Sequence, residues 1–140
     1  MKEITTNLIK FMFAGNCTFI VSDGQTNNSY KIFKKTPLPG EEKKIGVYQL
    51  YIKHGGKNIY CGYFKIQDRV MKFRCNNKYG IEESDERLQM LLTFIKLRDD
   101  YTPLHLYHTG RCAHCGRLLT DEKSIDRGFG PDCWKLINNL

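Results

Sequence analysis

IGVYQLYIKHGGKNIYCGYFKI, residues 45–66, decides the fold class of this chain. Two runs rich in β-branched and aromatic residues, 45–53 and 58–66, flank the sequence HGGK at 54–57. Runs of this composition favour β-strands, and a glycine pair supplies the positive φ angles that a tight hairpin turn needs. The stretch therefore predicts an antiparallel β-hairpin.

Further strands are expected on both sides of this hairpin. CTFIVSD (17–23) and SYKIFKK (29–35) are separated by turn residues and predict a second hairpin, and RVMKFRC (69–75) follows the first one. TPLPGEEKK (36–44) contains two prolines, which do not fit inside a sheet, so we expect a mobile loop there. Together these runs predict a small antiparallel sheet of about four or five strands.

The stretch SDERLQMLLTFIKLRDD (84–100) predicts one amphipathic helix. Leu88, Leu91, Leu92 and Ile95 recur at the spacing that places side chains on one helical face. The serine and aspartate at its start can cap the helix, and the proline that follows Thr102 ends it. We expect the apolar face to pack on the sheet.

The charge of the chain is uneven. The 140 residues carry a formal net charge of +7, and residues 1–80 hold 14 Lys and Arg against 5 Asp and Glu. A basic field favours nucleic acid or an acidic protein surface as partner. The lysine-rich loop 34–44 and the acidic start of the helix are candidate contacts.

The sequence shows no sign of a membrane segment. No run approaches the roughly 18 apolar residues that a span requires, and MKEITTNLIKFMF (1–13) lacks the apolar run of a secretory signal. We therefore expect a cytoplasmic protein with no membrane partner. In that reducing compartment the 6 cysteines are better explained as metal ligands or thiols than as disulfides.

Three cysteines near the C-terminus have the spacing of a metal site. Cys112 and Cys115 form a CxxC pair, and Cys133 falls in the first turn of a short helix that Pro131 and Asp132 can begin. A CxxC knuckle followed by a thiolate at a helix N-terminus is typical of treble-clef-like sites, where Zn²⁺ takes four tetrahedral ligands. We therefore predict Zn²⁺ as the cofactor.

The fourth ligand must come from elsewhere. His108 lies four residues before the knuckle, on an expected strand that leads into it, and this HxxxC separation lets the chain return to the ion. His105, His114 and a water molecule are the alternatives. The predicted metal ligands are therefore His108, Cys112, Cys115 and Cys133.

These elements together predict an α+β fold. It consists of a small antiparallel β-sheet with one amphipathic helix, followed by a C-terminal treble-clef-like zinc finger. The expected domains are a basic, β-rich domain at 1–101 and a zinc-binding module at 102–140.

GRCAHCGRLLTDEKSIDRGFGPDCWKL (110–136) resembles the C-terminal zinc-binding module of a family of small, largely uncharacterised phage and prophage proteins. The residues that match its pattern are His108, Gly110, Cys112, Cys115, Gly116, Arg117, Leu119, Thr120, Ser124, Gly128, Gly130, Pro131 and Cys133. The resemblance implies zinc and a phage setting, hence the cytoplasm of a host bacterium. It implies no reaction.

Enzyme activity is not expected. A closed site with four protein ligands leaves no position for a catalytic water, and the chain contains no catalytic triad order, P-loop or dinucleotide motif. A thioredoxin-type use of CxxC would need a βαβ unit around the pair. Cys17, Cys61 and Cys75 lie apart on expected strands and are expected to pack in the core.

Two functions fit these observations. The first is an anti-CRISPR inhibitor of a Cas9-type effector, because small non-enzymatic proteins with basic surfaces are common in that class and the resemblance suggests a phage. The second is a nucleic-acid-binding phage accessory protein. Basic and aromatic residues interleave in YKIFKK (30–35), YQLYIK (48–53) and MKFR (71–74), although alternation sends about half of such side chains inward.

Overall fold

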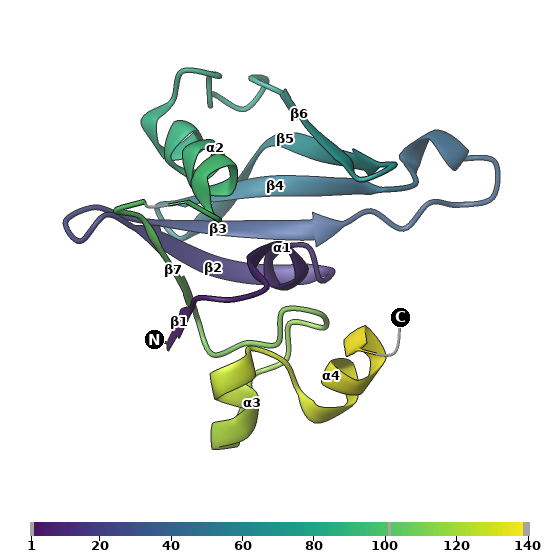
Figure 1. Cartoon of the computed structure of the whole chain (residues 1–140). Helices are drawn as coiled ribbons and strands as arrows, with labels where there is room; N and C mark the ends of the chain where they lie inside the picture. Colours follow the sequence, from purple (N-terminus) through teal and green to yellow (C-terminus); the bar gives the residue numbers. More distant parts are fainter. Residues whose placement is uncertain (1, 101, 139–140) are drawn as a thin grey trace.

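The computed structural model describes residues 2–100 and 102–138, and within them one antiparallel sheet of seven strands dominates the fold (Figure 1). The strands lie in the order β1-β7-β2-β3-β4-β5-β6. Their bounds are Lys2–Ile4 (β1), Asn16–Ser22 (β2), Asn27–Lys34 (β3), Val47–His54 (β4), Lys57–Gln67 (β5), Val70–Cys75 (β6) and His105–His108 (β7). The arrangement agrees with the α+β class, but the sheet is larger than the small one predicted.

Both predicted hairpins are present. β2 pairs with β3 and β4 pairs with β5, while β6 continues the sheet along β5. Gly55 and Gly56 have φ angles of 57° and 80° at the tip of the second hairpin, as the glycine pair in the sequence predicted. The predicted loop that joins the hairpins contains one short 3₁₀ helix, η1 (Glu42–Lys44).

A β-bulge interrupts the pairing of β4 with β5. Leu50 pairs with Gly62, but the next residue, Tyr51, pairs with Tyr60, so Cys61 is an extra residue on β5. Such a residue shifts the alternation of side chains between the two halves of its strand. Cys61 and Gly62 are consequently both buried although they are adjacent.

The predicted amphipathic helix is α2 (Glu86–Leu97). Leu88 and Leu91 are buried, as their spacing predicted, whereas Leu92 is half-buried and Phe94 is buried instead. The helix therefore presents a slightly rotated face to the sheet.

A second helix, α1 (Leu8–Met12), lies on the same side of the sheet as α2 (Figure 1). The hydroxyl of Tyr30 on β3 donates a hydrogen bond to the Arg87 carbonyl of α2 at 2.5 Å. Phe13, directly after α1, packs edge-on against Phe64 of β5 with ring centroids 5.1 Å apart. Tyr30 thus contacts α2, and Phe64 contacts the residue that follows α1. The core lies between these two helices and the face of the sheet that carries Tyr30 and Phe64.

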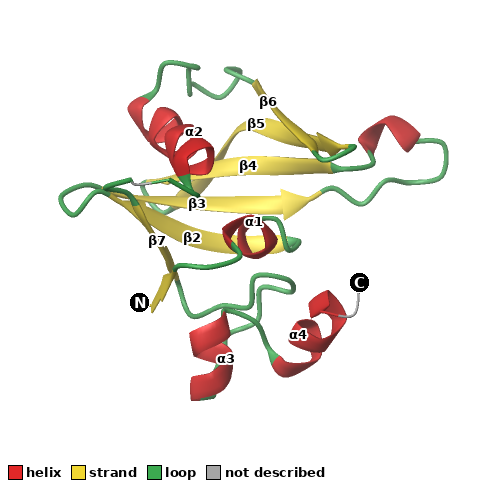
Figure 2. Cartoon of the chain, viewed as in Figure 1, coloured by secondary structure: helices red, strands yellow, loops and turns green. Residues whose placement is uncertain are grey.

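The C-terminal segment begins inside the sheet. β7 pairs with β1 on one side and with β2 on the other. After it come the cysteine knuckle, α3 (Glu122–Arg127) and α4 (Pro131–Asn138), which lie below the sheet in Figure 2. The division into 1–101 and 102–140 stays a prediction, but the strand expected to lead into the module is itself part of the sheet.

None of the described helices is long and apolar enough to cross a membrane.

Aromatic contacts join the C-terminal segment to the N-terminal one. The ring of Phe11 on α1 lies 6.1 Å from that of Phe129, which lies 5.7 Å from Trp134 on α4. Gly128 ends α3 with φ +80°, and a Cβ there would come within 2.5 Å of the Phe11 ring. The glycine is therefore needed both for its backbone conformation and for this close approach.

We expect Gly128→Ala to lower the free energy of unfolding by more than Gly110→Ala does. Gly110 has φ +87° and nothing within 4 Å of an added Cβ, so alanine there costs only the left-handed conformation, about 1–2 kcal/mol. At Gly128 overpacking against Phe11 should add about 1–3 kcal/mol. Chemical denaturation followed by circular dichroism measures both values, and equal losses would contradict the packing of Phe11 on this glycine.

Candidate functional site

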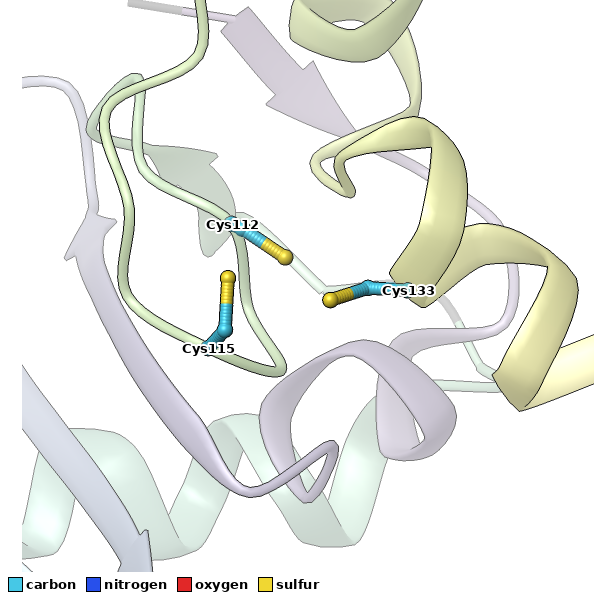
Figure 3. A group of neighbouring side chains, drawn as sticks. All are labelled: Cys112, Cys115 and Cys133. Atoms are coloured by element: carbon cyan, nitrogen blue, oxygen red, sulfur yellow. The ribbon is translucent and has the colours of Figure 1, made fainter.

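Three thiols meet beside the sheet, where they could hold a metal ion (Figure 3). Cys112 and Cys115 lie on the knuckle after β7, and Cys133 lies in the first turn of α4. Their sulfur atoms all lie within 4.8 Å of one another. This grouping of the three predicted cysteines agrees with their spacing in the sequence.

Backbone hydrogen bonds shape the knuckle. The Gly116 N–H donates to the Cys112 carbonyl at 2.8 Å, and the Cys112 N–H donates to the Arg117 carbonyl at 2.8 Å. Gly116 has φ +78°, which glycine adopts without strain. The tight turn brings the sulfur of Cys115 back towards that of Cys112.

The surroundings of the thiols favour a bound cation. Burial opposes ionisation of Cys112, but the backbone N–H groups of Gly130, Cys115 and His114 outweigh it and lower the pKa of this thiol. Burial, together with hydrogen bonds to the other two thiols, raises the pKa of Cys133 to about 12. A cation among the three sulfurs would compensate their negative charge and replace the protons.

His108, the predicted fourth ligand, does not belong to this cluster. It is buried, with 1% of its surface exposed, and both ring nitrogens have backbone partners. The Gly110 N–H donates to Nδ1 at 2.9 Å, and Nε2 bonds the carbonyl oxygen of Ile125. Burial lowers the pKa of His108, which agrees with a neutral ring that accepts at Nδ1 and donates at Nε2. The HxxxC spacing could not reveal these competing partners.

The two histidines that were alternative candidates for the fourth ligand also lie outside the cluster. Nδ1 of His105 lies 2.8 Å from a carboxylate oxygen of Glu3, and His114 lies within the knuckle with Nδ1 buried. A cavity of about 160 Å³ opens beside the thiols and is lined in part by Asp121 and Ser124. Water or an oxygen ligand could approach the thiols from this side.

A second candidate site is the face of the sheet that points away from the helices, here called the open face. Side chains alternate along a strand, so residues paired across strands share a face. Lys31 on β3 lies between Thr18 and Tyr51, and Tyr51 lies beside Tyr60. A neighbouring row consists of Asn16, Phe33, Gln49, Tyr63 and Arg74.

The contacts of α1, α2 and α3 show that these helices lie on the opposite face of the sheet. α2 bonds Tyr30, α3 bonds His108, and Phe13 after α1 packs on Phe64, all of which point to the opposite face. Phe33 on the open face is 39% exposed. The sequence pattern showed that aromatic and basic residues interleave, but only the strand register shows which of them face outward.

The open face carries charge of one sign. The described strands β2 to β6 contain no acidic residue. Lys31 and Lys53 lie on the middle strands, and Lys65, Lys72 and Arg74 lie on β5 and β6. Five of the 14 Lys and Arg in the first 80 residues therefore lie on this face.

Most of these cations border a groove of about 540 Å³, here called the lysine groove. It lies where β4, β5 and β6 meet the loop after β3, and the Lys65 ammonium donates to the Lys43 carbonyl of that loop at 2.8 Å. In the described residues, Lys44 alone among the groove cations has an ion-pair partner, Glu41. The cations of the groove are Lys35, Lys43, Lys44, Lys65, Lys72 and Arg74.

Residues 102–138 match the model of a family of unknown function, DUF6011. The match covers β7, the knuckle, α3 and α4, which is the segment that carries the three thiols. Strands β1 to β6, and with them the lysine groove, lie outside it. The chain matches no curated protein and no solved structure.

We expect Cys112→Ser and Cys133→Ser to lose bound metal. Each removes one of three clustered thiolates, and a loss of thiolate ligands lowers the affinity for zinc strongly. After equilibration with zinc and gel filtration, elemental analysis should give about one ion per wild-type chain and far less per variant. Cys75→Ser, on β6 and outside the cluster, is the matched control.

His108→Gln should keep its zinc and melt at a lower temperature. It disturbs two buried hydrogen bonds, each worth about 1–3 kcal/mol when one partner is left unsatisfied. Loss of zinc from this variant with unchanged melting would instead establish His108 as a ligand.

Proposed function

We propose that this protein binds nucleic acid through the open face of its sheet. The observation that carries the proposal is that cations and aromatic rings share a face whose strands, β2 to β6, contain no acidic residue among those described. A surface of this kind attracts phosphates, and half-exposed aromatic rings offer contacts to bases.

The placement of the cations supports a polyanion more strongly than their number does. A basic surface that served only solubility would spread its charges and mix the two signs. Here the lysine groove gathers six cations around one depression, with Glu41 the ion-pair partner of Lys44. Phosphates that enter the groove would release counterions and gain affinity at low salt.

We propose zinc as the ion of the three thiols and a structural role for it. Thiolates at a knuckle and a helix start suit zinc, and α4 and the knuckle are too small to form a core alone. The ion would hold α4 beside the knuckle, which directly follows β7, and so would support the edge of the sheet. The protein then acts by binding and not by catalysis.

The inhibition of a Cas9-type effector, with its phage setting, stays a prediction. Effectors of that type hold their guide–target heteroduplex in a positively charged channel, which would repel the lysine groove. The charge of the open face therefore favours nucleic acid itself over docking in such a channel.

The proposal is tested by fluorescence anisotropy with labelled DNA and RNA at several salt concentrations. We expect binding that weakens as salt rises, and a loss of at least about tenfold in affinity for Lys72→Glu combined with Arg74→Glu. The slope of log affinity against log salt should also decrease, because two phosphate contacts are lost.

Lys96→Glu with Lys135→Glu is the control, since both lysines are exposed on helices and the change in net charge is the same. An equal loss in both double variants would mean that net charge alone drives binding and would contradict the proposed face. If no nucleic acid binds while target cleavage by a Cas9-type effector is inhibited, the prediction of an inhibitor replaces this proposal.

A further inference from the structure

A second depression of the open face, here called the tyrosine hollow, lies next to the lysine groove. Its volume is about 670 Å³, within the range of sites for small organic ligands. The rings of Tyr51 and Tyr60 lie 5.6 Å apart, and those of Tyr60 and Tyr79 lie 6.3 Å apart. Tyr79 is 57% exposed. Aromatic rings therefore gather at the surface here and not in the core.

The rings of the hollow are inclined to one another and are not stacked face to face. The Tyr51 and Tyr60 planes are inclined by 59°, and the Tyr60 and Tyr79 planes by 74°. In an edge-to-face pair the edge of one ring meets one face of its neighbour, and the opposite face of that neighbour is left for a flat heterocycle to stack on. The ammonium of Lys78 lies 5.6 Å from the centre of the Tyr79 ring, so the aromatic surface also has a cation beside it.

One residue connects the hollow with the groove. Gln49 borders both depressions, and its side-chain oxygen accepts a hydrogen bond from the Tyr51 hydroxyl at 3.1 Å. Tyr63 lies opposite Gln49 on β5, and Arg74 lies opposite Tyr63 on β6. An extended ligand could thus contact the aromatic rings and the cations at the same time, and no acidic side chain of the described strands lies between them.

We propose that the ligand of this surface is a single-stranded nucleic acid, with a base in the tyrosine hollow and neighbouring phosphates in the lysine groove. The inference rests on the proposed function and narrows it. In a double helix the faces of the bases are covered by their neighbours, so a duplex could use the groove but not the hollow.

The polar groups of the hollow agree with this ligand. Burial raises the pKa of Tyr51 and of Tyr60, so both phenols stay neutral and do not repel phosphate. The amide of Gln49 can donate to or accept from the edge of a base. Stacking of bases on aromatic rings depends little on the identity of the base, so we expect weak sequence preference.

The test compares three kinds of polyanion in anisotropy titrations, with labelled nucleic acids as ligands and heparin as an unlabelled competitor. These are single strands of about 12 nucleotides, as DNA and as RNA, a duplex of the same length, and heparin, which has charge but no bases. We expect Tyr60→Leu combined with Tyr79→Ser to lower single-strand affinity by at least about tenfold, while heparin competes equally for wild type and variant. Comparison of DNA with RNA shows which sugar is preferred.

Tyr107→Leu is the matched control, since Tyr107 lies on β7 and is separated from β4 by two strands of the sheet. Thermal melting confirms that all variants are folded. Binding of the duplex at least as tight as that of single strands, or an equal loss for heparin, overturns the single-strand inference and leaves the proposed function standing. The absence of binding to every nucleic acid overturns the proposed function itself.

Discussion

The two hydrogen bonds of the His108 ring hold the C-terminal segment to the sheet. His108 belongs to β7, where it pairs with Lys2 of β1 and Phe19 of β2, yet its ring nitrogens bond backbone groups of Gly110 and Ile125. A buried imidazole that satisfies two backbone groups fixes both its own tautomer and the positions of the segments it joins. The His108 ring therefore helps to place the knuckle and α3 relative to the sheet, together with the Asn16 N–H of β2, which donates to the Ala113 carbonyl of the knuckle at 2.9 Å.

The three thiols are a second feature that could stabilise the C-terminal segment. A segment of this size cannot bury enough apolar surface to fold alone, and small modules depend on a metal or on contacts with a larger core. This one has contacts with the larger core, because Phe11 packs on Phe129 and approaches Gly128, and it also has three grouped sulfurs that could hold a metal ion. The segment is thus better described as an edge of one fold than as an appended finger.

Local patterns revealed the parts of the fold that local forces stabilise. The hairpins and α2 follow from strand composition, the glycine turn and helical periodicity, and the thiol cluster follows from cysteine spacing. The strand that leads into the knuckle, β7, was expected, but β1 is too short to leave a pattern, and the sequence could not show that Lys2 pairs with His108 across about a hundred residues of chain. The hydrogen bonds of His108 depend on two backbone groups that only the folded chain brings near, so its spacing in the sequence could not reveal them, and its role as a ligand stays a prediction.

The bulge at Cys61 has a consequence for how this surface can change. Tyr60 and Tyr63 are three positions apart, and in a regular strand they would point to opposite faces. The extra residue puts both on the open face, Tyr60 opposite Tyr51 and Tyr63 opposite Gln49. The outward placement of both rings therefore depends on the number of residues in β5. Deletion of one residue at the bulge would turn half of β5 over and would place Tyr60 and Tyr63 on opposite faces of the sheet.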